Sequence, residues 1–161
     1  MSWEDVAKLV LAAVFAGAAT VTITWLKSLW DEQRALTEGF SKAVRDSADL
    51  ATGYWLKPGD ADDLQLLEAR LVGAQTYLSH FRLIATSHFS TPDRLWFLGA
   101  LTDLFDQMTE GQFKVTGRAA DHQRAEECQR LANEIAIHAL SSHRRAMSVG
   151  ALFGRLLSWR K

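Results

Sequence analysis

Residues 9–26, LVLAAVFAGAATVTITWL, are 18 consecutive residues without a charged side chain, bordered by Lys8 and Lys27. In an α-helix, which rises 1.5 Å per residue, the stretch spans about 27 Å, close to the thickness of the hydrocarbon core of a bilayer. Three tryptophans, whose indole rings favour the membrane–water interface, lie near its ends: Trp3, Trp25 and Trp30. We therefore predict that residues 1–27 form a single transmembrane anchor.

Two other interpretations of this stretch stay open. Ala16-Gly17-Ala18 has the A-x-A form of a signal-peptide cleavage site, but Glu4 and Asp5 precede the apolar run, and the run continues past that site. A buried core helix is the second alternative, although a stretch that is apolar on every face is more typical of a membrane helix.

The charges on the two sides of the anchor predict its orientation. On the N-terminal side Lys8 stands among two acids, whereas Lys27, Arg34, Lys42 and Arg45 follow the anchor. The positive-inside rule then places the helical domain in the cytoplasm, with the N-terminus outside. The localisation that we expect is a membrane of the bacterial inner-membrane type. The single cysteine, which cannot form an internal disulfide, agrees with a reducing compartment.

One face of the predicted anchor carries small or hydroxylated side chains. Ala13, Gly17, Thr20 and Thr24 follow one another at steps of four, three and four residues, so they share a helix face. Small residues allow two membrane helices to approach closely, and threonines can hydrogen-bond between helices. This face predicts self-association into a homo-oligomer. A stronger form of the prediction is that the face lines a pore.

The rest of the chain predicts an all-α fold, a bundle of about four to five helices over residues 28–147. Only two prolines occur, and apolar residues recur at helical spacing. The expected inward faces are Leu29, Leu36, Phe40, Val44, Ser47, Leu50 and Tyr54; Leu64, Leu67, Leu71, Ala74, Leu78, Phe81, Ala85 and His88; Leu95, Leu98, Leu101, Phe105 and Met108; and Ala125, Cys128, Leu131, Ile135 and His138 or Ala139.

Local signals predict where the helices begin and end. The membrane helix and the next helix lack a breaker between them, which predicts one helix of over 40 residues ending at Lys57-Pro58-Gly59. Asp60 or Asp62 is expected to cap the following helix. Ser90-Thr91-Pro92-Asp93 is a strong helix start, residues 110–117 indicate a loop, and Asp121 is expected to begin the next helix.

Charge is distributed unevenly along the chain. Residues 28–138 contain 11 Lys and Arg against 17 Asp and Glu, whereas residues 139–161 contain five basic residues and no acid. An acidic body argues against a nucleic-acid partner, and the basic end favours lipid headgroups. Residues 148–161 predict a basic amphipathic helix, either interfacial or closing the bundle. The expected lipid contacts are Arg144, Arg145, Arg155, Trp159, Arg160 and Lys161.

The sequence contains none of the common motifs for catalysis or cofactor binding. The phosphate-binding GxxxxGK[ST], the dinucleotide-binding GxGxxG, HExxH and GxSxG are all absent. The pairs Glu134/His138 and His122/Glu126 each offer two metal ligands, fewer than the three or four that a site requires. We therefore predict no cofactor and no metal.

One short segment resembles a catalytic motif. Arg82-Leu-Ile-Ala-Thr-Ser-His88 is similar to the R-x(4–6)-H motif of HEPN domains, which are helical bundles and often RNases. The resemblance implies that His88 would serve 2′-hydroxyl chemistry and that Arg82 would hold the phosphate. The alternative is that His88, which completes the apolar face of its helix, caps or packs, since six helical steps place it on a different face from Arg82.

The order of the parts supports a broader resemblance. One membrane helix followed by a HEPN-like bundle is similar to small membrane accessory proteins of RNA-targeting CRISPR systems and other antiviral systems. This resemblance implies a non-enzymatic oligomer that perturbs the membrane. A passive anchor for a cytosolic protein partner and a membrane-tethered HEPN-like RNase are the alternative functions.

Overall fold

The computed structural model describes residues 2–148, in which helices are the only regular secondary structure. It contains four helices, α1 (Trp3–Trp55), α2 (Leu64–Ala85), α3 (Thr91–Thr109) and α4 (His122–Ala146). The all-α prediction is confirmed. The bundle has four helical members, the C-terminal part of α1 together with α2, α3 and α4, so its first member is continuous with the predicted anchor and the described chain has four helices in all.

Helix α1 runs for 53 residues without a break, as the absence of a breaker predicted. The chain nevertheless divides into two compact units, residues 1–34 and residues 35–161. The first unit is the N-terminal part of α1. The second unit is the four-helix bundle. The predicted C-terminal helix, residues 148–161, lies outside the described residues apart from its first residue.

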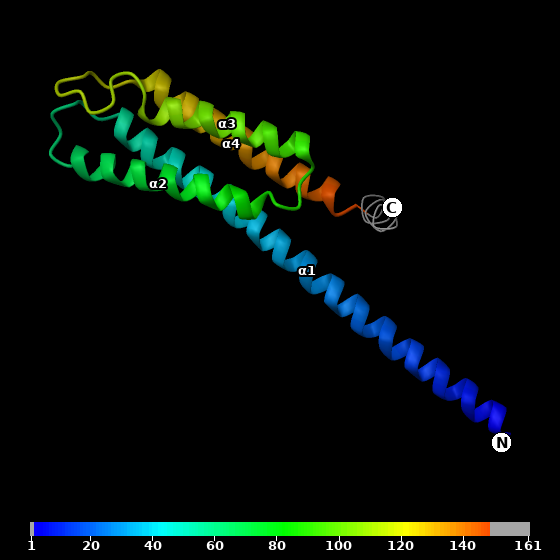
Figure 1. Cartoon of the computed structure of the whole chain (residues 1–161). Coiled ribbons are helices and arrows are strands. Elements are labelled where there is room, and N and C mark those ends of the chain that lie inside the picture. The colour runs from blue at the N-terminus through cyan, green and yellow to red at the C-terminus, as the bar shows by residue number, and fades with distance from the viewer. Residues whose placement is uncertain (1, 149–161) are drawn as a thin grey trace. The chain divides into compact units, whose positions relative to one another are not determined.

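The bundle has two distinct ends (Figure 1). At one end, which we call the turn end, residues 86–90 connect α2 to α3, and α4 finishes nearby. At the other, the loop end, residues 56–63 connect α1 to α2 and residues 110–121 connect α3 to α4. Phe40 of α1 lies towards the turn end, where its ring meets those of Phe81 and Phe97 edge-on at 6.1 and 6.0 Å.

The core follows the heptad-like spacing of α1. Its buried positions include a row that alternates in steps of three and four and a second row at intervals of seven beside it: Thr37, Phe40, Val44, Ser47, Ala51 and Tyr54, and Ser41, Ala48 and Trp55. The helix contacts α2, α3 and α4. Leu64, Leu71, Leu78 and Ala85 supply the buried row of α2 at intervals of seven residues. On α4 the buried face is rich in alanine, which allows that helix to approach closely. Cys128 and Ala139 are buried there, and His138 is only partly buried, so Ala139 is the inward residue of the two alternatives.

The predicted core face of α3 is partly wrong. Leu95 and Leu98 are exposed, and the buried residues are Phe97, Leu101, Leu104 and Met108. Both sets recur at helical spacing, so periodicity alone did not distinguish them. The ring of Phe97 decides between them, because it packs against Phe40 and Phe89 and fixes the rotation of the helix.

The local start signals were largely correct. Ser90 caps α3 by accepting a hydrogen bond from the backbone N–H of Asp93, and Asp121 caps α4 through the N–H of Arg124. The predicted cap of α2 is wrong: Asp63 takes the N-cap position, and its carboxylate pairs with Lys57 instead of capping the helix. Residues 58–61 form a turn before the helix, in which the N–H of Ala61 donates to the carbonyl of Pro58, so α2 begins later than predicted.

A buried arginine fastens the 110–121 loop to α1. The guanidinium of Arg118 donates 2.6 Å to the carbonyl of Tyr54 and lies over the rings of Tyr54 and Trp55, with centroid distances of 4.3 and 4.7 Å. Gly59 donates to the carbonyl of Arg118, and Asp121 donates to the carbonyl of Trp55, both at 2.8 Å. The loop end is therefore held by backbone contacts rather than by packing alone.

Candidate functional site

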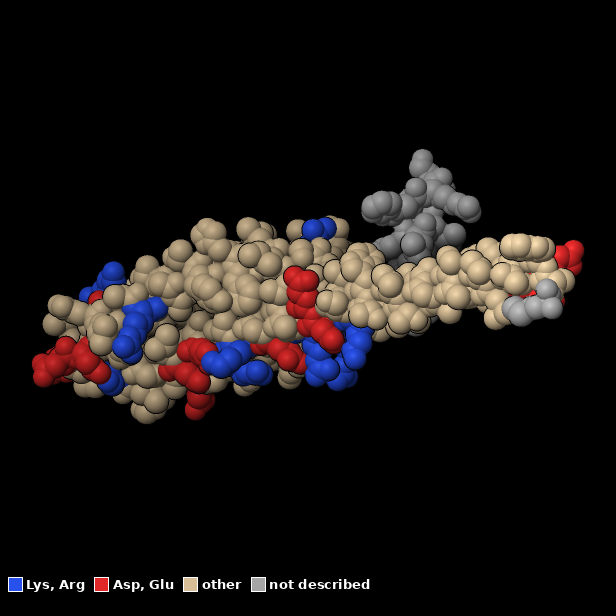
Figure 2. All heavy atoms as spheres, turned by 90° about the horizontal axis from the view of Figure 1, so that it is seen from below, with Lys and Arg blue, Asp and Glu red and all other residues tan. Residues whose placement is uncertain are grey.

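The N-terminal part of α1 holds a stretch long and apolar enough to cross a membrane. Every side chain from residue 3 to residue 25 is exposed in the folded chain. The face seen in Figure 2 shows this stretch as surface without acidic or basic side chains, up to the acids near the N-terminus. Within residues 2–148, no other part of the chain buries the side chains of residues 3–25.

The small face of this stretch is open along its length. Nothing lies within 4 Å of the position that a Cβ would take at Gly17. The hydroxyl of Thr20 donates 2.9 Å to the carbonyl of Ala16, and that of Thr24 donates 2.9 Å to the carbonyl of Thr20. These hydroxyls therefore have their donor satisfied inside the helix, which lowers the cost of placing them in a bilayer. Each oxygen keeps acceptor capacity for a neighbouring helix.

The structure separates Arg82 and His88 into different elements. Arg82 lies in the last turn of α2, whereas His88 lies in the α2–α3 connection, because the helix ends at Ala85 and not at His88 as expected. The Thr86 hydroxyl and N–H both donate to the carbonyl of Arg82, which closes the helix. Nε2 of His88 is 3.1 Å from Nδ1 of His143 on α4, a contact in which one ring donates and the other accepts.

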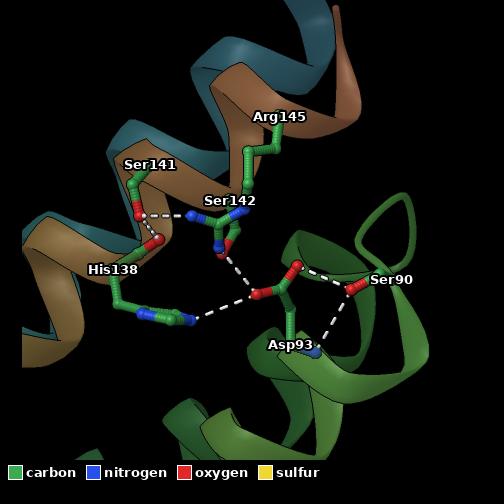
Figure 3. Close-up of polar contacts among 6 residues, drawn as sticks. All are labelled: Ser90, Asp93, His138, Ser141, Ser142 and Arg145. Carbon is green, nitrogen blue, oxygen red and sulfur yellow. Dashed lines mark hydrogen bonds and ion pairs between the residues drawn. The ribbon is translucent and has the colours of Figure 1, made fainter. Parts of the chain in front are cut away.

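A polar cluster around Asp93 joins α3 to α4 at the turn end (Figure 3). One carboxylate oxygen of Asp93 lies 3.2 Å from Nε2 of His138 and 2.8 Å from Nη2 of Arg145. The other oxygen accepts a 2.7 Å hydrogen bond from the Ser90 hydroxyl. The carboxylate is 15% exposed, so it is a largely buried charge with several donors directed at it.

Two opposing effects set the charge state of this cluster. Burial raises the pKa of Asp93, but hydrogen bonds from Ser90, Arg145 and Ser142, and the positive charge of Arg145, outweigh burial and hold the pKa below its usual value. Asp93 is therefore ionised near neutral pH. The ring of Trp96 stacks on His138 at 3.9 Å and fixes the imidazole against the carboxylate.

Sequence reasoning missed this cluster. Ser90-Asp93 was recognised only as a helix start, and His138 only as a core residue or a half-formed metal pair. Its partners are 45 and 52 residues away along the chain, and no local motif links them.

Both members of one candidate metal pair, Glu134 and His138, have other partners. His138 faces Asp93, and Glu134 pairs with Arg130 at 3.0 Å. Among residues 2–148 no group of three or more His, Cys, Asp or Glu side chains is arranged to hold a metal ion.

The predicted lipid-contacting residues fall into three groups. Arg144 is exposed on the last turn of α4. Arg145 is half exposed and forms an ion pair with Asp93, so its charge is largely neutralised within the bundle. Arg155, Trp159, Arg160 and Lys161 lie outside the described residues.

Comparison with known protein families, with curated proteins and with solved structures finds no match for this chain.

Proposed function

We propose that this protein is a non-enzymatic, single-pass membrane protein whose N-terminal helices associate in the bilayer, and whose cytoplasmic bundle makes it a membrane-perturbing effector or accessory subunit. The antiviral systems that its layout resembles give the biological setting of the proposal. The observation that carries it is the uncharged stretch of α1, in which every side chain from residue 9 to residue 25 is exposed.

Simple energetics support membrane insertion. The stretch contains eight Leu, Ile, Val or Phe residues. Each favours insertion by about 0.3–0.6 kcal/mol, which sums to roughly 2–5 kcal/mol. In water the same surface would be an apolar patch far larger than monomeric soluble proteins normally expose. One lysine at its centre costs about 3 kcal/mol, enough to cancel most of the gain.

Alkaline carbonate extraction of membranes tests the anchor. Wild-type protein is expected to stay with the membrane, and a Gly17→Lys/Ala18→Lys variant is expected to be released. Thr76→Lys, at an exposed position on α2, serves as the control and should behave as wild type. Release of the wild-type protein would refute membrane spanning.

The small face supports the self-association part of the proposal. Leucine at Gly17 or Thr20 would separate two helices that meet there, whereas Ala19→Leu adds the same bulk away from that face. Light scattering of detergent-extracted protein should give an oligomer for wild type and for Ala19→Leu, and a smaller mass for Gly17→Leu. Liposome leakage should follow the same order. A wild-type monomer, or leakage unchanged by Gly17→Leu, would exclude the pore version.

A passive scaffold is the second candidate function. It is favoured by a hollow between α3 and α4 that Trp96, Asp103, Arg130 and Glu134 line, where a cytosolic protein could bind. Replacement of residues 1–27 by an unrelated membrane helix distinguishes the two. Function should survive the replacement for a scaffold and should be lost for a membrane effector.

The third alternative is a membrane-tethered HEPN-like RNase. The contact between His88 and His143 places a proton donor beside an acceptor, which favours testing it. Metal-independent RNA cleavage that Arg82→Ala or His88→Ala abolishes would support this alternative, and cleavage by both variants would remove these residues from it.

A further inference from the structure

The two ends of the bundle differ strongly in charge. Residues 56–70 and 103–127, which form the loop end, contain ten acids and five bases. Residues 79–100 and 135–148, which form the turn end, contain four arginines and a single acid. That acid is Asp93, which is largely buried and paired with Arg145. The α1 residues at the turn end, 35–46, add Lys42 and Arg45 against Glu38 and Asp46, so that end carries six basic side chains against three acids and is the basic pole of the bundle.

Apolar side chains are exposed at the same end. Leu95 is 64% exposed in the second turn of α3, and Leu83 and Ile84 are exposed in the last turn of α2. Arg94, which directly precedes Leu95 in the sequence, is exposed. Arg144, in the last turn of α4, is exposed as well. Exposed basic side chains and exposed leucine and isoleucine at one end of a domain are the composition that binds anionic membrane surfaces.

The chain enters the bundle at the turn end. Thr37 and Phe40 are buried there, and Phe40 contacts Phe81 and Phe97. The bundle unit begins at Ala35, nine positions after Leu26, which is at most about 14 Å of helix. The headgroup layer of a bilayer is roughly 5–7 Å thick, and electrostatic screening in physiological salt acts over about 8 Å. Added together, these two lengths are similar to the length of helix between Leu26 and Ala35. The basic pole therefore comes within the electrostatic range of a membrane that holds residues 9–26.

We propose that the turn end is a bilayer-docking surface, in which Arg94 and Arg144 contact anionic headgroups and Leu83, Ile84 and Leu95 enter the interfacial layer. The inference rests on the proposed membrane anchor and adds to it: the bundle lies against the membrane instead of standing clear of it. It also makes docking dependent on anionic lipid, because basic side chains outnumber acids six to three in residues 35–46, 79–100 and 135–148.

Three single-cysteine labels on the full chain, in a Cys128→Ala background, test this surface. Phe15→Cys reports the anchor, Leu95→Cys reports the turn end, and Leu66→Cys is the control at the loop end, where the leucine is similarly exposed at 55%. Each protein carries an environment-sensitive fluorophore and is reconstituted into phosphatidylcholine vesicles with or without phosphatidylglycerol. Quenching by brominated acyl chains measures lipid contact, and iodide measures water access.

The expected result is strong lipid quenching of Phe15→Cys in both vesicle types. Leu95→Cys should be quenched at least twofold more than Leu66→Cys, and only with phosphatidylglycerol present. Adding Arg94→Gln and Arg144→Gln should reduce the Leu95→Cys signal to the Leu66→Cys level. The matched loop-end pair, Arg70→Gln and Lys114→Gln, should leave it unchanged.

Three results would overturn the inference. Equal iodide access at Leu95→Cys and Leu66→Cys, with Phe15→Cys quenched by lipid, rejects the docking surface and leaves the anchor intact. Shielding of Leu95→Cys from iodide without lipid quenching means that protein covers it, either a second copy or another part of the chain. An unquenched Phe15→Cys refutes the anchor and the docking surface together.

Discussion

Asp93 is the residue on which the turn end depends most. Asp93→Asn keeps the shape of the side chain but removes the negative charge that Arg145, His138 and Ser90 contact. Because hydrogen bonds to a charged group contribute about 1.5–3 kcal/mol each in net stability, we expect a loss of about 2 kcal/mol in the free energy of unfolding. Urea titration of both proteins in detergent measures this difference in the free energy of unfolding. Asp103→Asn, at an exposed position on the same helix, should change it little.

The lowered pKa of Asp93 predicts a pH dependence with a definite sign. The unfolded carboxyl titrates near pH 3.9, and the folded one below that value, so the unfolded chain takes up the proton first. The stability that this group contributes is present in full above pH 4–5 and is lost as the pH falls through the folded pKa. The unfolding midpoints of wild type and Asp93→Asn should therefore converge below about pH 4; midpoints that stay parallel would contradict this assignment.

Cys128 is predicted to be inert while the bundle is folded. Burial on α4 raises the pKa of its thiol to about 12, so the reactive thiolate is scarce at pH 8. A thiol reagent such as DTNB should modify it at least a hundredfold more slowly in the native protein than in urea. Rapid labelling in the native protein would mean that α4 opens easily.

At the scale of the elements, the connection between α1 and α2 depends on a close backbone approach. A Cβ at Gly59 would lie 2.6 Å from the backbone nitrogen of Arg118 and 2.7 Å from that of Gly117. Gly59→Ala should therefore destabilise the bundle by about 2 kcal/mol, since backbone atoms must move. Gly73→Ala is the matched control: the site is helical and open, and alanine should stabilise the helix by roughly 0.5–1 kcal/mol. Thermal unfolding compares the two.

Elements were predictable where their signals are local. The Ser90 cap, the break at Pro58-Gly59 and the cap at Asp121 each lie within a few residues of the boundary that they set, and the structure places boundaries at all three. The rotation of α3 was not predictable, because both of its apolar faces have helical spacing and a distant partner, Phe40, selects between them. The Asp93 cluster and the Arg118 contacts escaped prediction for the same reason, since they join segments 45–64 residues apart.

For the whole molecule, the two units predict two kinds of amide protection. The bundle is protected by its own packing, whereas the side chains of residues 9–25 are exposed among the described residues. In liposomes, where water is absent from the hydrocarbon core, amide exchange over residues 9–26 should be slower than over residues 28–34. Exchange measured by mass spectrometry distinguishes them, with α4 as the protected reference. Equal, fast exchange over both segments would contradict membrane spanning.

The burial of Arg118 has a consequence for proteolysis. Trypsin cleaves after lysine and arginine, and a twelve-residue surface loop such as 110–121 is where nicking normally occurs. Lys114 is exposed in that loop, but the Arg118 side chain is 5% exposed and lies between two aromatic rings. Limited digestion of the native bundle should therefore cut this loop after Lys114 and spare the bond after Arg118, so that a fragment beginning at Ala119 would mark chains in which the loop has already left α1.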